Sequence, residues 1–316
     1  MDYFLRRLVA ACLTIFSVAT LIFLVLHLVP GDPAQILLSS GGIAPSPDAV
    51  AALRESLGLN QPLHVQYGRY LMRLISLDLG TSFQDGAAIL PEIIKRTPRT
   101  VELVGAAGII AIFIGVPAGL VAALRRGGVI DSAFSALASF GLSVPVFVTG
   151  TLMILLFSQT LRLVPAGGFA EFSADPVQHL LYLVMPAFSI AFSLIPVVFR
   201  MMRTSVLEMM EREWVRTARA KGLEESRVLR RHVVRNSIAP VLSVLALQLG
   251  SLLGGTVLVE YVFNWPGLSG MLVQAVEQRD YPAVQGIVLV ICLLFVIINL
   301  GVEMLYGLLD PRVRGR

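Results

Sequence analysis

The chain has 316 residues, of which 56% are hydrophobic and only 15% are charged, and its mean hydropathy is +0.78. Because soluble globular domains carry about 25% charged residues, this composition excludes a soluble globular chain and predicts an integral membrane protein. The net charge of +4 leaves nucleic acid open as a partner until the positions of the basic residues are considered. Cys12 and Cys292 both lie in apolar segments, so we expect neither a disulfide framework nor a metal site.

The first apolar segment covers residues 8–29 and is long enough to cross a hydrocarbon layer of about 30 Å as a helix. Arg6 and Arg7 precede it, as basic residues precede the apolar region of a secretory signal. That region is only about 7–15 residues long in a signal, and no small-x-small cleavage site follows here. We therefore expect a retained first transmembrane helix.

Residues 30–99 are polar, rich in proline and glycine, and carry charges of both signs. Ser46, Pro47 and Asp48 have the order of an N-cap, a first-turn proline and an acidic first turn, and Gly58 is suited to end that helix. Two further helices are predicted over residues 62–77 and 87–96. This part of the chain is expected to be a structured extracytoplasmic insert, so that residues 1–99 comprise the first transmembrane helix and the insert.

Five more apolar segments, each of 20 residues or more, predict five further spans. They cover residues 101–124, 133–157, 180–199, 238–259 and 284–309. Membrane helices tolerate the prolines inside them, Pro117, Pro145, Pro186 and Pro196, because neighbouring groups satisfy the freed carbonyls. Two Gly-x-x-x-Gly pairs, Gly115 with Gly119 and Gly250 with Gly254, favour close helix approach.

The distribution of basic residues predicts the orientation. With the N-terminus in the cytoplasm, cytoplasmic segments carry 17 of the 25 Lys and Arg residues, and six of the other eight lie in the long insert. The sequence therefore predicts an all-α polytopic membrane protein with six transmembrane helices and both termini in the cytoplasm. Because topology accounts for the basic surplus, no nucleic-acid partner is expected.

The predicted spans have no Asp, Glu, Lys or Arg near their middle; Glu102, Glu260 and Glu303 lie near span ends. Ion-coupled carriers usually place ionisable groups at mid-membrane, and intramembrane enzymes need His, Asp or Glu pairs at helical spacing. A stand-alone secondary carrier and an intramembrane enzyme are thus the less favoured alternatives. The sequence also has no phosphate-binding loop, so we expect no ATP site in this chain, and a partner would supply the energy for uphill transport. We assign no catalytic residue and no cofactor.

Residues 213–240 form a charged segment between apolar ones. Ser205 and Glu208 fit a capping box at the start of a helix. Gly222, in the left-handed conformation, would end that helix, and a second helix is predicted to begin at Glu224 or Glu225. One continuous stripe at helical spacing is predicted along Leu207, Met210, Trp214, Ala218 and Lys221. The segment is either a solvated basic loop or a short helix that seats in a groove of another protein.

The segment at residues 216–222 is similar to the EAA-x-x-x-G loop of ABC importer permeases. Ala218 and Gly222 match, Arg216 and Thr217 replace the first two motif residues, and the second half, expected at residues 232–235, does not match. The following blocks, spread along the whole chain, resemble the B-type subunit of the dipeptide/oligopeptide (peptide/nickel-type) subfamily: HLVPGDPA, LGLNQPLHVQYGRYL, DLGTS, GLSVPVF, VRTARAKGL, RH-x-x-RN, LVEYVFNWPGL, RDYPAVQG and LLDPR.

The resemblance implies a permease subunit of the bacterial or archaeal cytoplasmic membrane, embedded in lipid, that imports peptides by alternating access. Its partners would be a second homologous permease, two cytoplasmic ATPases and an extracytoplasmic binding protein. Related systems carry nickel chelates, haem, glutathione or oligosaccharides, and the sequence does not choose among them.

The resemblance also implies two sites within a transmembrane domain spanning residues 100–316. The ATPase-coupling residues, in a loop over about residues 204–236, are Arg216, Thr217, Ala218, Ala220, Lys221 and Gly222. Residues at the outer mouth of the path are Glu260, Asn264, Trp265, Pro266 and Gly267, although an aromatic residue there is also typical of an interfacial anchor.

Three other features are given mainly structural roles. Pro30 to Pro33 is expected to be a rigid turn after the first helix, capped by Asp32, and a frame for docking of the binding protein is the less favoured alternative. Arg279, Asp280 and Tyr281 provide either an outer charge contact or a loop-fixing hydrogen bond. His27, His64 and His179 are interpreted as isolated structural residues.

Overall fold

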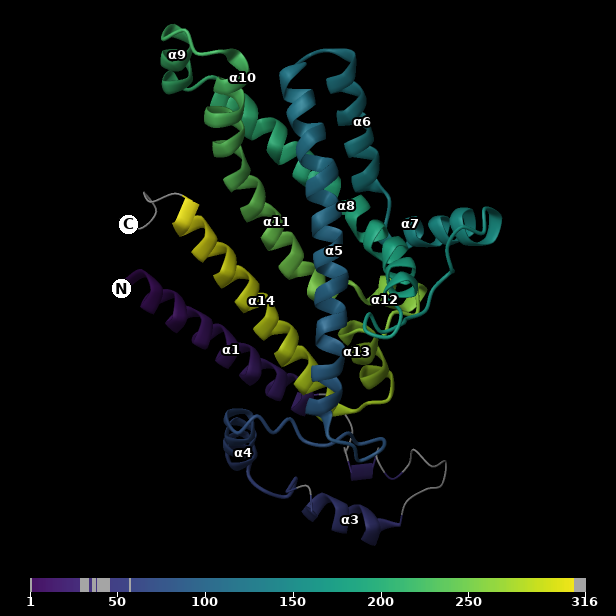
Figure 1. Ribbon diagram of the computed structural model, residues 1–316. Helices are drawn as coiled ribbons and strands as arrows, with labels where there is room; N and C mark the ends of the chain where they lie inside the picture. The colour runs from purple at the N-terminus through teal and green to yellow at the C-terminus, as the bar shows by residue number, and fades with distance from the viewer. Residues whose placement is uncertain (1, 29–33, 36–37, 39–45, 57, 310–316) are drawn as a thin grey trace. The chain divides into compact units, whose positions relative to one another are not determined.

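The computed structural model describes residues 2–28, 34–35, 38, 46–56 and 58–309, and these form an all-α structure (Figure 1). The one β feature in these ranges is an isolated bridge between Thr81 and Ala88. The expected turn at Pro30 to Pro33 and most of the LLDPR block lie outside the described residues.

The helices follow one another in chain order. They are α1 (Asp2–Leu28), α3 (Pro47–Ser56), α4 (Leu63–Ile75), α5 (Ile89–Leu124), α6 (Val129–Ser143), α7 (Val146–Met153), π-helical η1 (Ile154–Thr160), α8 (Pro176–Met210), α9 (Glu213–Ala220), α10 (Glu225–Val228), π-helical η2 (Leu229–Val234), α11 (Arg235–Gly255), α12 (Val257–Val262), α13 (Leu268–Glu277) and α14 (Tyr281–Leu309).

Five helical segments of the described chain are long and apolar enough to cross a membrane. They are α1, α5, α8, the continuous segment from α10 to α11, and α14. A sixth span is reached if α6 is counted together with α7 and η1, which are bent by 99° from it. The prediction of a polytopic all-α protein is therefore confirmed.

The span predicted over residues 133–157 is present only as a bent pair of helices, so expecting one continuous helix through Pro145 is wrong. The helix breaks at Val144, whose extended backbone (φ −91°, ψ 122°) ends α6, and Pro145 precedes the first residue of α7. A residue before proline is pushed out of the helical region, and proline has no N–H to continue the ladder. The hydroxyl of Ser189 donates to the carbonyl of Val146 at 2.8 Å, which satisfies one of the groups near the break. Figure 1 shows α7 leaving the direction of α6.

The helix start predicted at Ser205 is also wrong, because α8 continues through it to Met210. Ser205 is buried inside the helix, on the face that also carries Met202 and Val206. Packing of this face extends the helix beyond the local capping signal. The chain then turns at Glu211 and Arg212, so the stripe expected from Leu207 to Lys221 is divided between α8 and α9.

The chain divides into two compact units, one of Met1–Pro98 with Gly270–Leu293 and one of Arg99–Ser269 with Leu294–Arg316. In the first, α1 and α14 pack together through Ala19, Ile22 and Leu289. Helix α4 adds Tyr67 and Tyr70, whose rings lie 5.2 and 5.5 Å from that of Phe23. The amphipathic helix predicted over residues 62–77 is thus present as α4 and packs on α1.

The expected start of α3 is confirmed, because the Ala49 N–H donates to Ser46 Oγ at 3.3 Å. Gly58 has φ +68° and lies just after the helix, as predicted. The separate helix expected over residues 87–96 is instead the first part of α5, where Ile89 and Ile93 are buried.

Asp280 fixes two loops of the first unit. Its carboxylate accepts from Ser82 Oγ at 2.5 Å, from the Phe83 N–H at 3.2 Å and from the Ala283 N–H at 3.3 Å. Of the two roles considered for this segment, the structure shows the loop-fixing hydrogen bonds.

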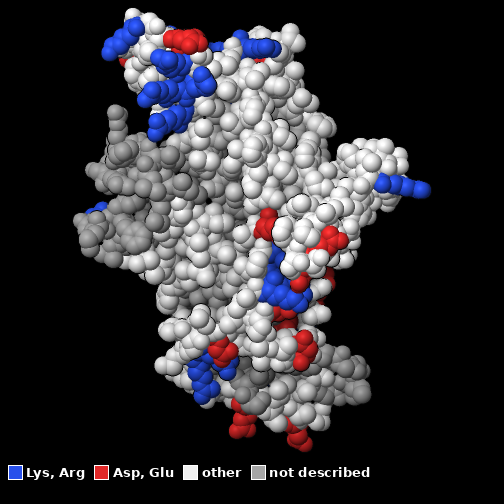
Figure 2. All heavy atoms as spheres, in the orientation of Figure 1, with Lys and Arg blue, Asp and Glu red and all other residues white. Residues whose placement is uncertain are grey.

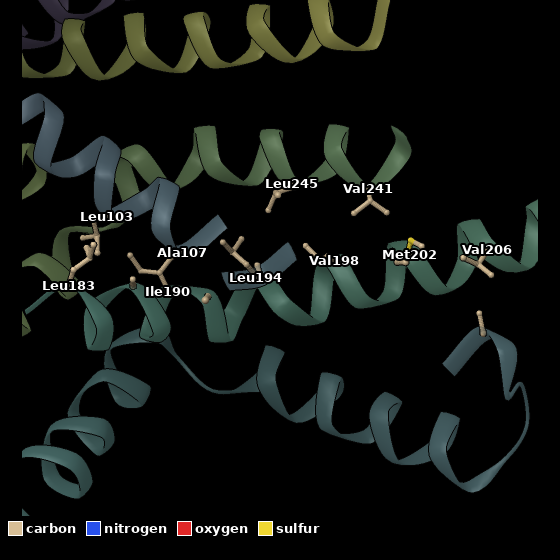
Figure 3. Packing of buried hydrophobic residues seen from close by; sticks show 14 of the residues in the cluster. Leu103, Ala107, Leu183, Ile190, Leu194, Val198, Met202, Val206, Val241 and Leu245 are labelled. Carbon is tan, nitrogen blue, oxygen red and sulfur yellow. The ribbon is translucent and has the colours of Figure 1, made fainter. Parts of the chain in front are cut away.

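In the second unit, α8 is the central helix. Its buried side chains, among them Ile190, Leu194 and Val198, point between α5 and α11 (Figure 3). Lipid tails are as apolar as these residues, so helices associate in a membrane mainly through close packing. Gly115 and Gly119 of α5 permit that packing, since a Cβ at Gly119 would lie 2.7 Å from the carbonyl oxygen of Phe199.

Gly119→Ala is therefore expected to destabilise the chain by about 1–3 kcal/mol, because α5 and α8 must move apart to admit the methyl group. Gly105 lies in the same helix with open space around its Cβ position, so Gly105→Ala is the matched control and should stabilise by up to about 1 kcal/mol. Thermal unfolding of the two purified variants in one detergent checks this. Equal midpoints would contradict the close α5–α8 contact.

Candidate functional site

Helix α9 and the turn that ends it, at Lys221 and Gly222, contain the residues predicted for coupling. The helix begins at Glu213, after Arg212 in an extended conformation, and has eight residues. Its end is a Schellman motif: the Leu223 N–H donates to the Ala218 carbonyl at 3.3 Å and the Gly222 N–H to the Arg219 carbonyl at 2.9 Å. Gly222 has φ +76°, which confirms the predicted left-handed glycine.

Two residues anchor α9 to its own chain. Val215 is fully buried and Ala218 is 7% exposed, and both belong to the core cluster that includes Val228 and Val233. Isolated helices of eight residues are unstable in water, so this packing and the Gly222 turn hold α9 in place. The other five predicted coupling residues are exposed: Arg216, Thr217, Ala220, Lys221 and Gly222.

Polar and aromatic contacts close the loop after α9. Arg219 donates two hydrogen bonds to Glu225, at 2.6 and 3.0 Å, and this pairing raises the pKa of the guanidinium above its ordinary value. The ring of His232 lies 6.2 Å from that of Trp214. His232, in the segment that does not match the permease motif, therefore contacts α9, whereas Arg235 is exposed at the start of α11.

The residues predicted at the outer mouth lie in and after α12, and most of them are buried. Glu260 is 1% exposed; its Oε1 accepts from Thr100 Oγ1 at 2.9 Å and from Thr256 Oγ1 at 3.1 Å. Thr100 in turn accepts from the Leu268 N–H at 2.8 Å. A Cβ on Gly267 would lie 2.3 Å from the Glu260 carboxylate. The glycine is thus required for the carboxylate to reach its partners.

Trp265 is also buried, and its indole N–H donates to the Arg99 carbonyl at 3.0 Å. Pro266 is half-buried, whereas Asn264 is exposed and has φ +50°. Asn264 is therefore the one of the five predicted mouth residues whose side chain is exposed. An interfacial anchor needs a ring that is exposed to the membrane surface, so this role does not fit the buried side chain of Trp265.

His179 is not isolated. Its ring lies 5.9 Å from Trp265, and its two nitrogens lie 2.7 Å from the Ala170 carbonyl and 2.7 Å from Glu102 Oε1. A carbonyl only accepts, so Nδ1 must carry a proton, and the second contact needs one more proton on either Nε2 or the carboxyl. The sequence did not show this pair, although a glutamate near a span end is a signal for a buried partner.

In the second unit, α9 lies at one end and α12 at the other (Figure 1). We call these the α9 end and the α12 end. Figure 2 shows basic side chains gathered around α9 and α10. Among the described residues, no group of three or more His, Cys, Asp or Glu is arranged to hold a metal ion.

Comparison with known proteins decides the family. The family described as "Binding-protein-dependent transport system inner membrane component" matches residues 115–315, and its N-terminal companion matches residues 1–104. The chain belongs to this family. It is therefore a transport component and a multi-pass membrane protein of a bacterial inner-membrane family, and the family associates with ATPases and substrate-binding proteins.

Two curated relatives match along their whole length. The chain is 39% identical to the glutathione transport system permease protein GsiC of Salmonella paratyphi A and 36% identical to the dipeptide transport system permease protein DppB of Escherichia coli K12, in both cases over 99% of each protein. Among solved structures, it is similar to the MetNI methionine ABC transporter in an inward-facing conformation. That match has TM-score 0.57 and 16% identity, over 70% of this chain and 98% of that one, and it shows the fold.

Proposed function

We propose that the chain is a peptide-importing ABC permease subunit whose α9 helix transmits the action of the ATPases. The observation that carries this is the construction of α9: a short helix with Arg216, Thr217 and Lys221 exposed and Val215 and Ala218 packed into the core. An exposed basic face suits an acidic groove of a partner. Ala218 would hold α9 against the core of its own chain and would not contact the partner.

The mechanical link runs through short connections. Only Glu211 and Arg212 separate α8 from α9, and the Arg219–Glu225 pair ties α9 to α10. Movement of α9 would therefore act on α8 on one side and on the α10–α11 segment on the other. Closure of two partner ATPases would tilt these helices and open the path, which is alternating access. Hydrolysis of ATP belongs to those partners in this proposal.

Orientation follows from charge. By the positive-inside rule, the basic residues around α9 support a cytoplasmic location for the α9 end. The distribution of Lys and Arg along the sequence likewise supports cytoplasmic termini. The α12 end would then face outward, with the Glu260–Gly267 segment at the mouth of the path and the insert of residues 30–99 beside the binding protein. Residues 100–316 would form the permease domain, paired with a second homologous permease.

Peptide is the proposed substrate class because the two relatives carry, by name, a dipeptide and glutathione, and glutathione is itself a tripeptide. A glutathione importer is the second candidate. Nickel chelates, haem and oligosaccharides remain less favoured.

The test is reconstitution of the chain in liposomes with the second permease, ATPases and binding protein encoded beside it. We expect uptake of a labelled dipeptide that requires ATP, the binding protein and this chain, with unlabelled glutathione competing only if it is the true substrate. Uptake by the chain alone, driven by an ion gradient, would support a secondary carrier and refute the proposal.

A further inference from the structure

An open groove of about 560 Å³ lies at the α9 end, between the turn that joins α5 to α6, the end of α8 and the helix α9. Three arginines line it, Arg125, Arg126 and Arg219, with a single carboxylate, that of Glu211. The rest of the wall includes the apolar side chains of Leu124, Leu207 and Met210. The groove is thus positively charged along part of its wall and apolar along another part.

The arginines are engaged to different degrees. Arg219 is held by Glu225, and Arg126 lies 3.5 Å from Glu211 in a pair whose side chains are both more than 60% exposed. Exposed pairs of this kind contribute little and exchange readily. Within the described part of the chain, the guanidinium of Arg125 has no hydrogen bond or ion pair, and only its backbone is hydrogen-bonded. An anion entering the groove would therefore find at least one free guanidinium and one loosely paired guanidinium.

The position of the groove, at the end of a membrane-spanning helix, indicates which kind of anion it would bind. Leu124 is the last residue of the apolar helix α5, and the two arginines follow it directly. A helix that crosses the bilayer and ends in this way puts its next residues at the level of the lipid phosphates. Guanidinium groups bind phosphate with paired, charge-assisted hydrogen bonds, and an apolar wall beside them suits the glycerol and upper acyl region of a lipid.

We propose that this groove binds the phosphate head group of an anionic phospholipid, which thereby contacts α9 through Arg219. The proposal requires only that the chain spans the membrane and does not depend on the substrate or on the coupling role of α9. An acidic surface of a partner ATPase is the competing occupant. The apolar part of the wall, which such a surface would leave unmatched, favours lipid.

The test measures phosphatidylglycerol and phosphatidylcholine binding to the purified full-length chain by native mass spectrometry during lipid titration. We expect preference for phosphatidylglycerol, and Arg125→Gln should weaken that binding about fivefold, since a basic residue near a membrane surface contributes about 1 kcal/mol. Glu211→Gln should strengthen it by a few-fold, because the repelling carboxylate is gone. Arg227→Gln, an exposed arginine of α10 outside the groove, is the matched control and should change binding less than twofold.

Opposite shifts in Arg125→Gln and Glu211→Gln, with none in Arg227→Gln, would support the proposal. Three results would overturn it: equal effects of all three substitutions, full displacement of the lipid by excess inorganic phosphate, which would indicate a free-anion site, or unchanged lipid binding in Arg125→Gln together with lost co-purification of the ATPase. The last result would assign the groove to a protein contact.

Discussion

Gly222→Asp is expected to abolish ATP-driven uptake while leaving the chain inserted in the membrane. Gly222 ends α9 with φ +76°, and nothing lies within 4 Å of its Cβ position, so an aspartate side chain fits without a clash. Its charge, however, appears at the C-terminal end of a helix and beside the basic face of α9. If that face meets an acidic surface on the ATPase, a new carboxylate repels the partner and offsets the attraction of Lys221.

Two further variants separate charge from backbone strain. Asn matches Asp in shape and is among the residues that best tolerate the left-handed conformation, so Gly222→Asn should retain most of the uptake. Gly222→Val should fail for a different reason, because a β-branched residue cannot readily adopt this φ and the turn would be lost. Uptake in proteoliposomes, normalised to inserted protein, distinguishes the three. Normal import by Gly222→Asp in the assembled complex would refute the coupling role.

The second large effect is expected at the α12 end, where Glu260→Ala should destabilise the chain by about 3 kcal/mol or more. The substitution removes the acceptor shared by the hydroxyls of Thr100 and Thr256, and both hydroxyls are buried. A buried hydroxyl that loses its acceptor costs about 1–3 kcal/mol, and this cost falls mainly on Thr100, because Thr256 Oγ1 keeps its contact with Ser269 Oγ at 3.0 Å. The Gly267 turn, which is shaped around the carboxylate, would also be left with a cavity.

Tryptophan fluorescence provides the local readout for this prediction. The chain has two tryptophans, and Trp214→Phe leaves only the buried Trp265 as a reporter. In that background, Glu260→Ala should move the emission to longer wavelength and lower the unfolding midpoint. Glu277→Ala, at an exposed glutamate of α13, is the control and should do neither. An unchanged emission and midpoint in Glu260→Ala would mean that the hydrogen bonds of this carboxylate contribute little.

Local signals in the sequence predicted much of the fold. Composition identified the membrane class, apolar length identified the spans, and Gly222 marked the end of α9 because only a few residues adopt its backbone conformation. Pro145 was noted as a tolerated proline, yet it separates α6 from α7, whereas Pro186 and Pro196 lie within α8 without interrupting it. Local sequence does not distinguish these cases, because tertiary packing decides whether the freed backbone groups find partners.

Contacts between distant residues could not be predicted from the sequence. His179 and Glu102 are 77 positions apart, and Thr100 and Glu260 are 160 apart, so no spacing rule connects them. Likewise, the motif resemblance assigned Ala218 to the coupling surface together with its neighbours. The direction in which each of these side chains points depends on the helix break at Glu211 and Arg212. The spacing of the predicted stripe, which runs without interruption from Leu207 to Lys221, gave no sign of this break.

Site-specific photocrosslinking tests the central proposal, contact between α9 and an ATPase, most directly. A photoreactive amino acid placed at Thr217, on the exposed face of α9, should form an adduct with the ATPase subunit in the assembled complex. The same group at Leu163, which is 67% exposed in the loop between η1 and α8, should form none. An ATPase adduct from position 163 together with none from position 217 would contradict both the coupling role of α9 and the proposed orientation.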